Sequence, residues 1–170
     1  MRILQLHCDS IEYTPTKKEI KSAEEIEPKK IRIEEVVVCF IAVEKDDDSD
    51  IAKNSIAEIQ ESMKKVGCDK LLLYPYAHLS STLASPGTGL KILKEMEESC
   101  TGISVMRAPF GWTKAFSIQV KGHPLAESSK VFSKDSSKDQ SKEKTSTALE
   151  AESKIKSYWY IMTPDGKMEE

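Results

Sequence analysis

The sequence predicts a mixed α/β domain in which two main helices pack on a β-sheet. The segment EEVVVCFIAVEK, residues 34–45, is apolar on both faces and rich in β-branched residues, which indicates a strand in the interior of a sheet. Apolar residues at helical spacing follow it over residues 52–66. A second short apolar run, LLLYPY at 71–76, then predicts another buried strand.

The segments before residue 34 are less regular. Ile3, Leu4 and Leu6 predict a first strand over residues 1–9, which ends near Asp9. Residues 14–32 are highly charged and contain two prolines, so we expect a long loop or a ragged hairpin there.

The helix after residue 48 has the clearest pattern in the chain. Ser49 or Asp50 can cap its start, and Gly67 can close its end. Its apolar residues recur at steps of four, three, four and three, and so share one face: Ala52, Ile56, Ile59, Met63 and Val66.

A second helix and two strands follow LLLYPY. Ser85 and Pro86 form a typical helix start, and Leu90, Leu93 and Met96 carry the helix to about Cys100. We expect a strand over residues 103–107, a turn over 108–114 that contains Pro109 and Gly111, and a half-buried strand over 115–121. In that last strand Phe116, Ile118 and Val120 alternate with polar residues.

Composition divides the chain into three parts. Residues 1–128 contain the predicted domain. Residues 129–153 are rich in Ser and Lys and have almost nothing to bury, which predicts a flexible linker. Residues 154–170 contain an aromatic strand over 158–162 and a Pro-Asp-Gly turn. We expect them to be the truncated start of a further module of a longer protein.

Length and charge exclude several classes of protein. No apolar run approaches the roughly 18 residues of a membrane helix, and MRILQLHCDS does not have the features of a signal peptide. We therefore expect a cytoplasmic location, with four reduced cysteines that pack as small apolar residues. A net charge of -3 argues against wholesale coating of nucleic acid, although it allows a local contact with one RNA end.

The stretch LYPYAHLSS, residues 73–81, places a histidine directly after a buried strand. The three histidines, His7, His78 and His123, are not at metal-ligand spacing, and neither a Gly-rich phosphate loop nor a GxSxG elbow is present. The sequence therefore implies no metal and no cofactor, and no serine nucleophile beside His78. Taken alone, His78 most simply hydrogen-bonds the loop backbone, but ligands bind at this edge of α/β sheets.

Two further stretches favour a functional role for this histidine. APFGWTKAF, residues 108–116, places Lys114 at the end of an aromatic turn. KGHPLAE, residues 121–127, places a lysine, a histidine and a glutamate in a loop after the next strand. Together with His78, these loops offer a cation, an imidazole and a carboxylate.

In that order and spacing, YPYAHLSS, RAPFGWTKAF and KGHPLAE resemble the N-terminal editing domain of archaeal threonyl-tRNA synthetases. MRILQLHCDSIEY, EEVVVCFIAVEK and WYIMTPDG are similar to that family too, and the resemblance covers about residues 1–128. It implies a fold like that of D-aminoacyl-tRNA deacylases, and a homodimer. The implied activity is hydrolysis of seryl-tRNA(Thr), while threonyl-tRNA(Thr) is spared. The implied partners are the 3′ end of tRNA(Thr) carrying serine and the catalytic and anticodon-binding domains of the synthetase.

The resemblance also implies roles for individual residues. Lys114, His78 and Glu127 would be the catalytic residues, which position the substrate and a water while the terminal ribose 2′-OH assists as base or proton relay. Val43, Phe110 and the backbone of Ala77 would line the pocket for the substrate. Thr113 stands where family members commonly have a tyrosine, and Trp112 can take over stacking on the terminal adenine.

Two other hypotheses remain open at this stage. The domain could instead remove D-amino acids from tRNA, which a comparison of D-seryl and L-seryl esters would reveal. It could also be a tRNA-docking or dimerisation module without activity, in which case it would bind tRNA without turnover.

Overall fold

The computed structural model describes residues 1–134, 161–162 and 168–169. The chain divides into two compact units, residues 1–136 and 137–170. The elements of the first unit are, in chain order, β1 (Arg2–Lys18), β2 (Ile31–Ala42), α1 (Ser49–Val66), β3 (Lys70–Pro75), the 3-10 helix η1 (Ala77–Leu79), α2 (Pro86–Ser99), β4 (Ser104–Arg107), β5 (Trp112–Val120) and β6 (Glu127–Val131).

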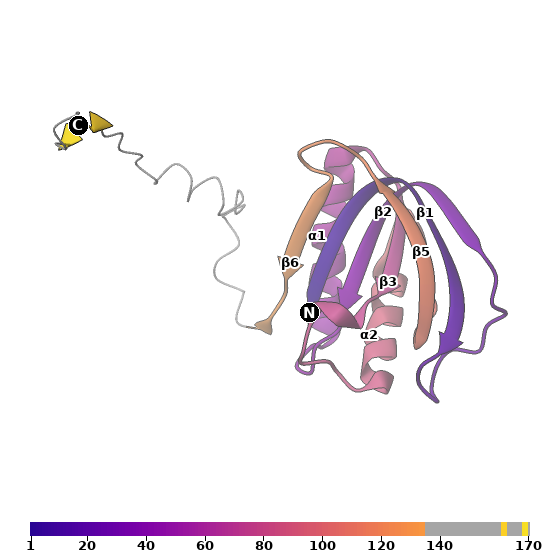
Figure 1. Ribbon diagram of the computed structural model, residues 1–170. Helices are drawn as coiled ribbons and strands as arrows, with labels where there is room; N and C mark the ends of the chain where they lie inside the picture. The colour runs from indigo at the N-terminus through magenta and orange to yellow at the C-terminus, as the bar shows by residue number, and fades with distance from the viewer. Residues whose placement is uncertain (135–160, 163–167, 170) are drawn as a thin grey trace. The chain divides into compact units, whose positions relative to one another are not determined.

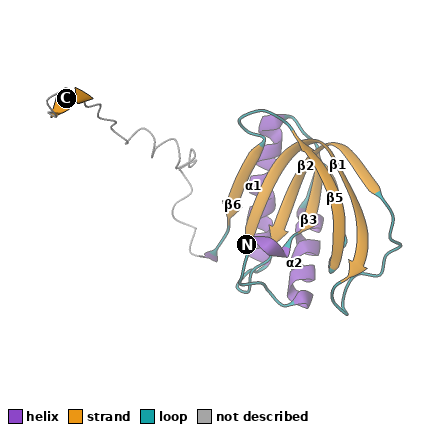
Figure 2. Cartoon of the chain, viewed as in Figure 1, coloured by secondary structure: helices purple, strands orange, loops and turns teal. Residues whose placement is uncertain are grey.

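The first unit is a curled mixed sheet with both helices on one face (Figures 1 and 2). The strand order is β4-β3-β2-β1-β5, and β6 also pairs with β1. β2, β3 and β4 are parallel, whereas β1 is antiparallel to β2, β5 and β6. One buried cluster lies between the sheet and the helices, and a second, which includes Phe40 and Tyr74, lies on the face away from them, called the open face below.

β1 is a long, strongly bent strand of the sheet (Figure 1). On the side away from β2, it pairs with a different neighbour along each half. Its residues 2–6 pair with β6, and its residues 8–18 pair with β5. The register with β5 shifts between Cys8 and Ser10 and again between Pro15 and Lys17. Such bulges add an unpaired residue and bend a strand, which fits the arch of β1.

The predicted strands and helices over residues 34–120 are confirmed. Some details of these elements, and the extent of the first strand, were wrong. β1 continues to Lys18 because Ile11 and Tyr13 are buried, so the loop expected over 14–32 is shorter, at residues 19–30. Asp48, rather than Ser49 or Asp50, caps α1 by accepting a hydrogen bond from the Ile51 amide. α2 buries Gly89, Ile92, Leu93 and Met96, while Leu90 is only half-buried.

The linker does not begin at residue 129 as predicted, because residues 127–131 form strand β6 against residues 2–6 of β1. Beyond it, Phe132 is buried in the cluster under the helices, and its amide donates to the Met1 carbonyl. Main-chain pairing holds this polar strand, and composition cannot reveal such pairing. The rest of the predicted linker, residues 135–153, lies outside the described residues.

In the second unit, β7 (Ile161–Met162) pairs antiparallel with β8 (Met168–Glu169). β7 coincides with the end of the strand expected over 158–162, whereas residues 158–160 and the Pro-Asp-Gly turn lie outside the described residues. Among the residues that the structure describes, no helix is long and apolar enough to cross a membrane.

Candidate active site

Four of the eight predicted site residues lie where the parallel strands end. β2, β3 and β4 end at residues 42, 75 and 107, and Val43, Ala77, His78 and Phe110 follow these ends within a few residues. The carboxyl ends of parallel strands meet at one edge of a sheet, where α/β proteins bind their ligands. The structure therefore brings these four residues to one edge.

Lys114 reaches this edge from β5, on the open face of the sheet. Its ammonium group donates to the carbonyls of Pro109 at 3.1 Å and Trp112 at 2.8 Å. It also lies 4.9 Å from the centre of the Tyr74 ring. Burial lowers the pKa of Lys114 to about 8, against an opposing effect of Glu24. An ammonium held by carbonyls and partly removed from water can stabilise an oxyanion.

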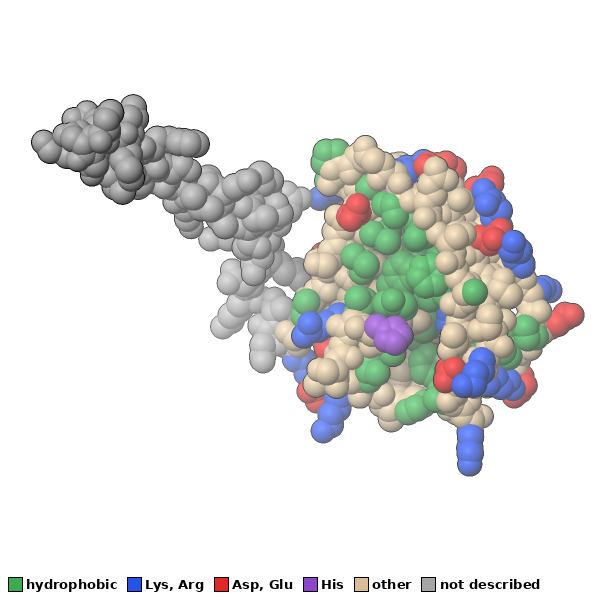
Figure 3. All heavy atoms as spheres, viewed as in Figure 1, with side chains coloured by type: hydrophobic (Ala, Val, Ile, Leu, Met, Phe, Trp, Pro, Cys, Tyr) green, Lys and Arg blue, Asp and Glu red, His purple; other side chains and the backbone are tan. Residues whose placement is uncertain are grey.

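His78 lies on the exposed η1 turn after β3, and aromatic rings connect it to Lys114. The rings of His78 and Tyr76 are 5.2 Å apart in an edge-on arrangement. Tyr76 lies 6.5 Å from Tyr74, whose ring faces the Lys114 ammonium. Phe116 is 43% exposed and packs on Tyr74. Figure 3 shows hydrophobic side chains gathered over this open face, with a histidine at their edge.

Glu44 anchors the loop that follows His78. Its Oε1 accepts hydrogen bonds from the hydroxyls of Ser80 and Thr82, and its Oε2 accepts one from the Met1 ammonium. Burial alone would raise the pKa of Glu44, but the bonds from Ser80, Met1 and Arg2 lower it to about 2. Ser80 is thus a loop hydrogen-bonder, as expected, and not a free nucleophile.

Val43 and Phe110 lie on the helix side of the same edge. Val43 is buried in the cluster under the helices, and its carbonyl accepts from the Ala84 amide. Phe110 packs against that cluster, and a Cβ added at Gly89 of α2 would lie 3.4 Å from its ring. The predicted pocket residues and Lys114 therefore approach the edge from opposite faces of the sheet.

Trp112 and Thr113 contact a segment that the sequence analysis missed. The indole N–H of Trp112 donates to the Glu24 carbonyl at 2.8 Å, and the Thr113 hydroxyl donates to the Glu19 carboxylate at 2.8 Å. Both acceptors belong to residues 19–25 between β1 and β2, which we call the strap. The sequence predicted these residues only as part of a charged loop, and a charged loop does not indicate which residues it will contact.

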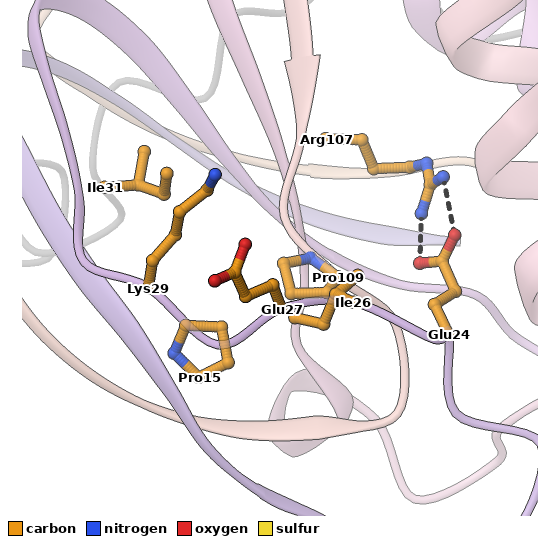
Figure 4. Close-up of a pocket in the computed structure, with 8 residues that line it drawn as sticks. All are labelled: Pro15, Glu24, Ile26, Glu27, Lys29, Ile31, Arg107 and Pro109. Atoms are coloured by element: carbon orange, nitrogen blue, oxygen red, sulfur yellow. Dashed lines mark hydrogen bonds and ion pairs between the residues drawn. The ribbon is translucent and has the colours of Figure 1, made fainter.

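A pocket of about 380 Å³ lies at the end of β4, where Arg107 and Pro109 border it (Figure 4). It contains the ion pair in which Arg107 donates two hydrogen bonds to Glu24, at 2.6 and 2.9 Å. Pro15, opposite Lys114 on β1, and Pro109, whose carbonyl accepts from Lys114, both border it. Its lining residues are Pro15, Glu24, Ile26, Glu27, Lys29, Ile31, Arg107 and Pro109.

Glu127 is not brought to this site within one chain. It is exposed at the start of β6, opposite Leu6 of β1, whereas Lys114 lies opposite Pro15. Leu6 and Pro15 are nine residues apart along the arched strand, which is about 30 Å of chain. Near Glu127, His7 and His123 share a hydrogen bond of 2.8 Å between Nδ1 and Nε2.

The site offers charge and hydrogen bonds for a hydrolytic reaction with water. The part of the chain that the structure describes contains no group of three or more His, Cys, Asp or Glu residues that could hold a metal ion. Burial raises the pKa of the Cys39 thiol well above its ordinary value and that of Cys8 to about 12, so neither is a thiolate near neutral pH.

Comparison with known proteins identifies the family. The archaea-specific editing domain of threonyl-tRNA synthetase matches residues 1–132. The chain is 64% identical over 169 residues to the threonine–tRNA ligase of Nitrosopumilus maritimus, and 51% identical over 168 residues to that of Cenarchaeum symbiosum. It covers 99% of its own length in both alignments, but only 27% and 26% of these relatives.

A solved structure has a similar fold at low sequence identity. The c-Myc DNA Unwinding Element Binding Protein superposes with a TM-score of 0.57 and 8% identity, over 78% of this chain and 99% of that one. This likeness agrees with the predicted mixed α/β fold, in which two main helices pack on a sheet. Editing is hydrolysis of an aminoacyl-tRNA ester, so the prediction of an enzyme is confirmed as well. The chain belongs to the archaea-specific editing domains of threonyl-tRNA synthetase.

Proposed function

We propose that this domain hydrolyses seryl-tRNA(Thr) and spares threonyl-tRNA(Thr). Serine lacks one methyl group of threonine, and a binding site gains only about 1–3 kcal/mol from one such group. The site that attaches threonine to tRNA therefore cannot reject serine well enough by binding alone, and a second site that hydrolyses the wrong ester is needed. The observation that carries the proposal is the Lys114 ammonium at the carboxyl edge of the sheet, joined to His78 through Tyr74 and Tyr76.

In the proposed reaction, water attacks the ester carbonyl between the aminoacyl group and the terminal ribose. Lys114 stabilises the negative oxygen of the tetrahedral intermediate, since its ammonium is already oriented by two carbonyls. His78, exposed on η1, positions the water and the substrate. The ribose 2′-OH relays the proton, so no serine or cysteine nucleophile is required.

The remaining predicted residues would recognise the substrate. Val43, Ala77 and Phe110 would limit the space for the amino acid side chain at the edge where β2, β3 and β4 end. The half-buried ring of Trp112 would stack on the terminal adenine. Thr113 cannot supply a phenol, and its hydroxyl is engaged by Glu19.

A role for Glu127 requires a second copy of the chain. Lys114 pairs with Pro15 of β1 and Glu127 with Leu6, nine residues away along that strand, so one chain does not bring them together. In the proposed homodimer, the Glu127 of one copy would act at the Lys114 site of the other. This arrangement makes the dimer part of the mechanism.

The wider setting follows the relatives, which are described as threonine–tRNA ligases. We propose that the domain works in the cytoplasm, in one chain with the catalytic and anticodon-binding domains of a synthetase. Its substrate would be the serine-bearing 3′ end of tRNA(Thr), transferred from the synthetic site.

The experiment that tests the function is a paired deacylation assay with seryl- and threonyl-tRNA(Thr). Faster hydrolysis of the seryl ester supports the proposal, and equal rates on both esters contradict it. Cleavage of D-seryl- but not L-seryl-tRNA would indicate a D-aminoacyl-tRNA deacylase, and binding without turnover would indicate a docking module.

Variants test the two central residues in the same assay. Lys114→Met should slow hydrolysis of the seryl ester by about 10²–10³-fold, and His78→Ala by about 10²-fold. Lys91→Met, which changes a largely exposed lysine on α2, is the matched control and should keep the wild-type rate. Unchanged rates in the first two variants would refute these roles.

A further inference from the structure

The carboxylate of Glu24, in the strap, holds the turn 108–113 that leads to Lys114. It binds the side chain of Arg107, just before the turn, and the backbone of Phe110, within the turn. It accepts two hydrogen bonds from Arg107 at 2.6 and 2.9 Å and one from the Phe110 amide at 2.7 Å. Figure 4 shows the Arg107 and Glu24 side chains facing each other at the edge of the pocket. These side chains are 11% and 20% exposed, respectively.

The backbone of Glu24 holds the same turn. Its amide donates to the Phe110 carbonyl at 3.2 Å, and its carbonyl accepts from the indole N–H of Trp112 at 2.8 Å. The Lys114 ammonium in turn donates to the carbonyls of Pro109 and Trp112, on either side of Phe110 and Gly111. The acceptors that orient Lys114 are thus part of the turn that Glu24 fixes.

Gly111 allows the strap to lie directly on this turn. It has a φ of 78°, and a Cβ at this position would lie 2.8 Å from the Cα of Ala23 and from a carbon of Ile20. The Glu19 amide also donates to the Gly111 carbonyl at 2.9 Å. The close contact leaves the turn little freedom to move independently of the strap.

We propose that Glu24 is a positioning residue for Lys114: it fixes the turn 108–113, whose carbonyls orient the Lys114 ammonium, and it places a carboxylate on that turn. The proposal rests on the proposed function of Lys114 and adds a residue that the family resemblance did not supply. Glu24 acts through Lys114 and the turn, and it does not itself contact the reacting atoms.

The charges around Lys114 are consistent with this role. Burial lowers the pKa of Lys114, and the charge of Glu24 raises it. Burial would also raise the pKa of Glu24, but hydrogen bonds from Arg107 and the Phe110 amide, together with the charges of Arg107 and Lys94, lower it, so Glu24 is ionised near neutral pH. Glu97, the second carboxylate on Arg107, accepts a hydrogen bond of 2.9 Å.

The test compares two variants that each remove one carboxylate from Arg107. Glu24→Gln keeps the shape of the side chain but removes its charge beside the turn. Glu97→Gln is the matched control, because Glu97 binds the same Arg107 side chain from α2 rather than from the strap. Glu24→Asp keeps the charge on a shorter side chain.

The first readout is the ionisation of Lys114, measured by pH-dependent acylation with acetic anhydride and quantified by peptide mass spectrometry. Glu24→Gln should lower the midpoint for Lys114 by about half a pH unit or more. Glu97→Gln should leave the midpoint near the wild-type value, and so should Glu24→Asp. An unchanged midpoint in Glu24→Gln, or an equal shift in Glu97→Gln, would overturn the proposal.

The second readout is the pH profile of seryl-tRNA(Thr) hydrolysis. Glu24→Gln should reduce kcat about tenfold with little change in KM, and should move the pH midpoint of kcat in the same direction as the acylation midpoint. Glu24→Asp should restore the wild-type pH midpoint. If Glu24→Gln does not fold, a shifted pH midpoint of kcat in Glu24→Asp would overturn the proposal.

The two proposals fail in different ways. A wild-type domain that hydrolyses neither ester refutes the proposed function, while the acylation midpoints still decide whether Glu24 controls the charge of Lys114. A wild-type domain that edits normally, with equal acylation midpoints in all variants, refutes only the role of Glu24.

Discussion

The ammonium group of Lys114 lies 4.9 Å from the centre of the Tyr74 ring. This contact joins two of the stretches that resemble the family: RAPFGWTKAF, which runs from the end of β4 into β5, and YPYAHLSS, which begins in β3. The ammonium lies on the open face of the sheet, where its burial lowers its pKa to about 8.

The rate of editing should depend on pH through Lys114. Below pH 8 the side chain is an ammonium that can stabilise the oxyanion, and above pH 8 it becomes a neutral amine. The enzyme-dependent rate should therefore fall as pH rises through about 8, after spontaneous ester hydrolysis is subtracted. The Lys114→Met variant should lack this descending limb. A rate that rises through pH 8 would instead indicate a general base.

The Tyr74 ring should stabilise the charged form of Lys114. A cation–π contact at a partly buried site contributes about 1–2 kcal/mol, so Tyr74→Leu should lower kcat for the seryl ester about tenfold. Tyr74→Phe keeps the ring and is the matched control, with an expected rate near wild type. Equal rates in Tyr74→Leu and Tyr74→Phe would show that the ring does not matter.

The loop that carries His78 should depend on Ser80 and not on its neighbour. Ser80→Ala removes the hydrogen bond to Glu44 and should lower kcat several-fold, with a loss of about 1 kcal/mol in unfolding free energy. Ser81→Ala changes an adjacent exposed hydroxyl and should have little effect. Steady-state kinetics on seryl-tRNA(Thr) separate the two, and a larger loss in Ser81→Ala would contradict the assignment.

The buried Met1 ammonium should be important for stability. It donates to Asp47 at 2.6 Å and to the Phe132 carbonyl at 2.7 Å, and the Asp47 side chain is only 3% exposed. Asp47→Asn leaves a buried positive charge with weaker compensation, which should cost about 3 kcal/mol. Urea denaturation measures this, with Asp46→Asn at an exposed position as control. Similar midpoints for both variants would refute the prediction.

Mixed dimers should show whether Glu127 acts across the interface. Lys114→Met and Glu127→Ala chains, each inactive alone, should regain about a quarter of wild-type activity after subunit exchange at equal amounts. Half of the dimers would then be mixed, with one intact site of two. No recovery, despite confirmed exchange, would mean that Glu127 does not complete the site of a partner.

Much of the fold could be predicted because its signals are local. Apolar residues that recur every three or four positions over residues 52–66 predicted the buried face of α1, and Ser85–Pro86 predicted the start of α2. The apolar run of β2 correctly indicated an interior strand. β6 could not be recognised, because residues 127–131 are mostly polar and are held by main-chain bonds to β1.

The candidate site was predictable only in part. The motifs of the sequence supplied the predicted residue set and the family, and they argued against a serine nucleophile. It contained no signal for the role of Glu24, because a glutamate in a charged loop resembles any solvated residue. Only the strap contacts with Arg107, Phe110 and Trp112 reveal that role.

The sequence by itself therefore determined most of the strands, both main helices, the edge that bears His78 and the family. The tertiary structure alone decided that Lys114 faces Tyr74, while Glu127 on β6 pairs with a distant part of β1. The physical reason is that periodicity and caps act within a few residues. The arch of β1 depends instead on bulges and on pairing with strands more than a hundred residues away in the sequence.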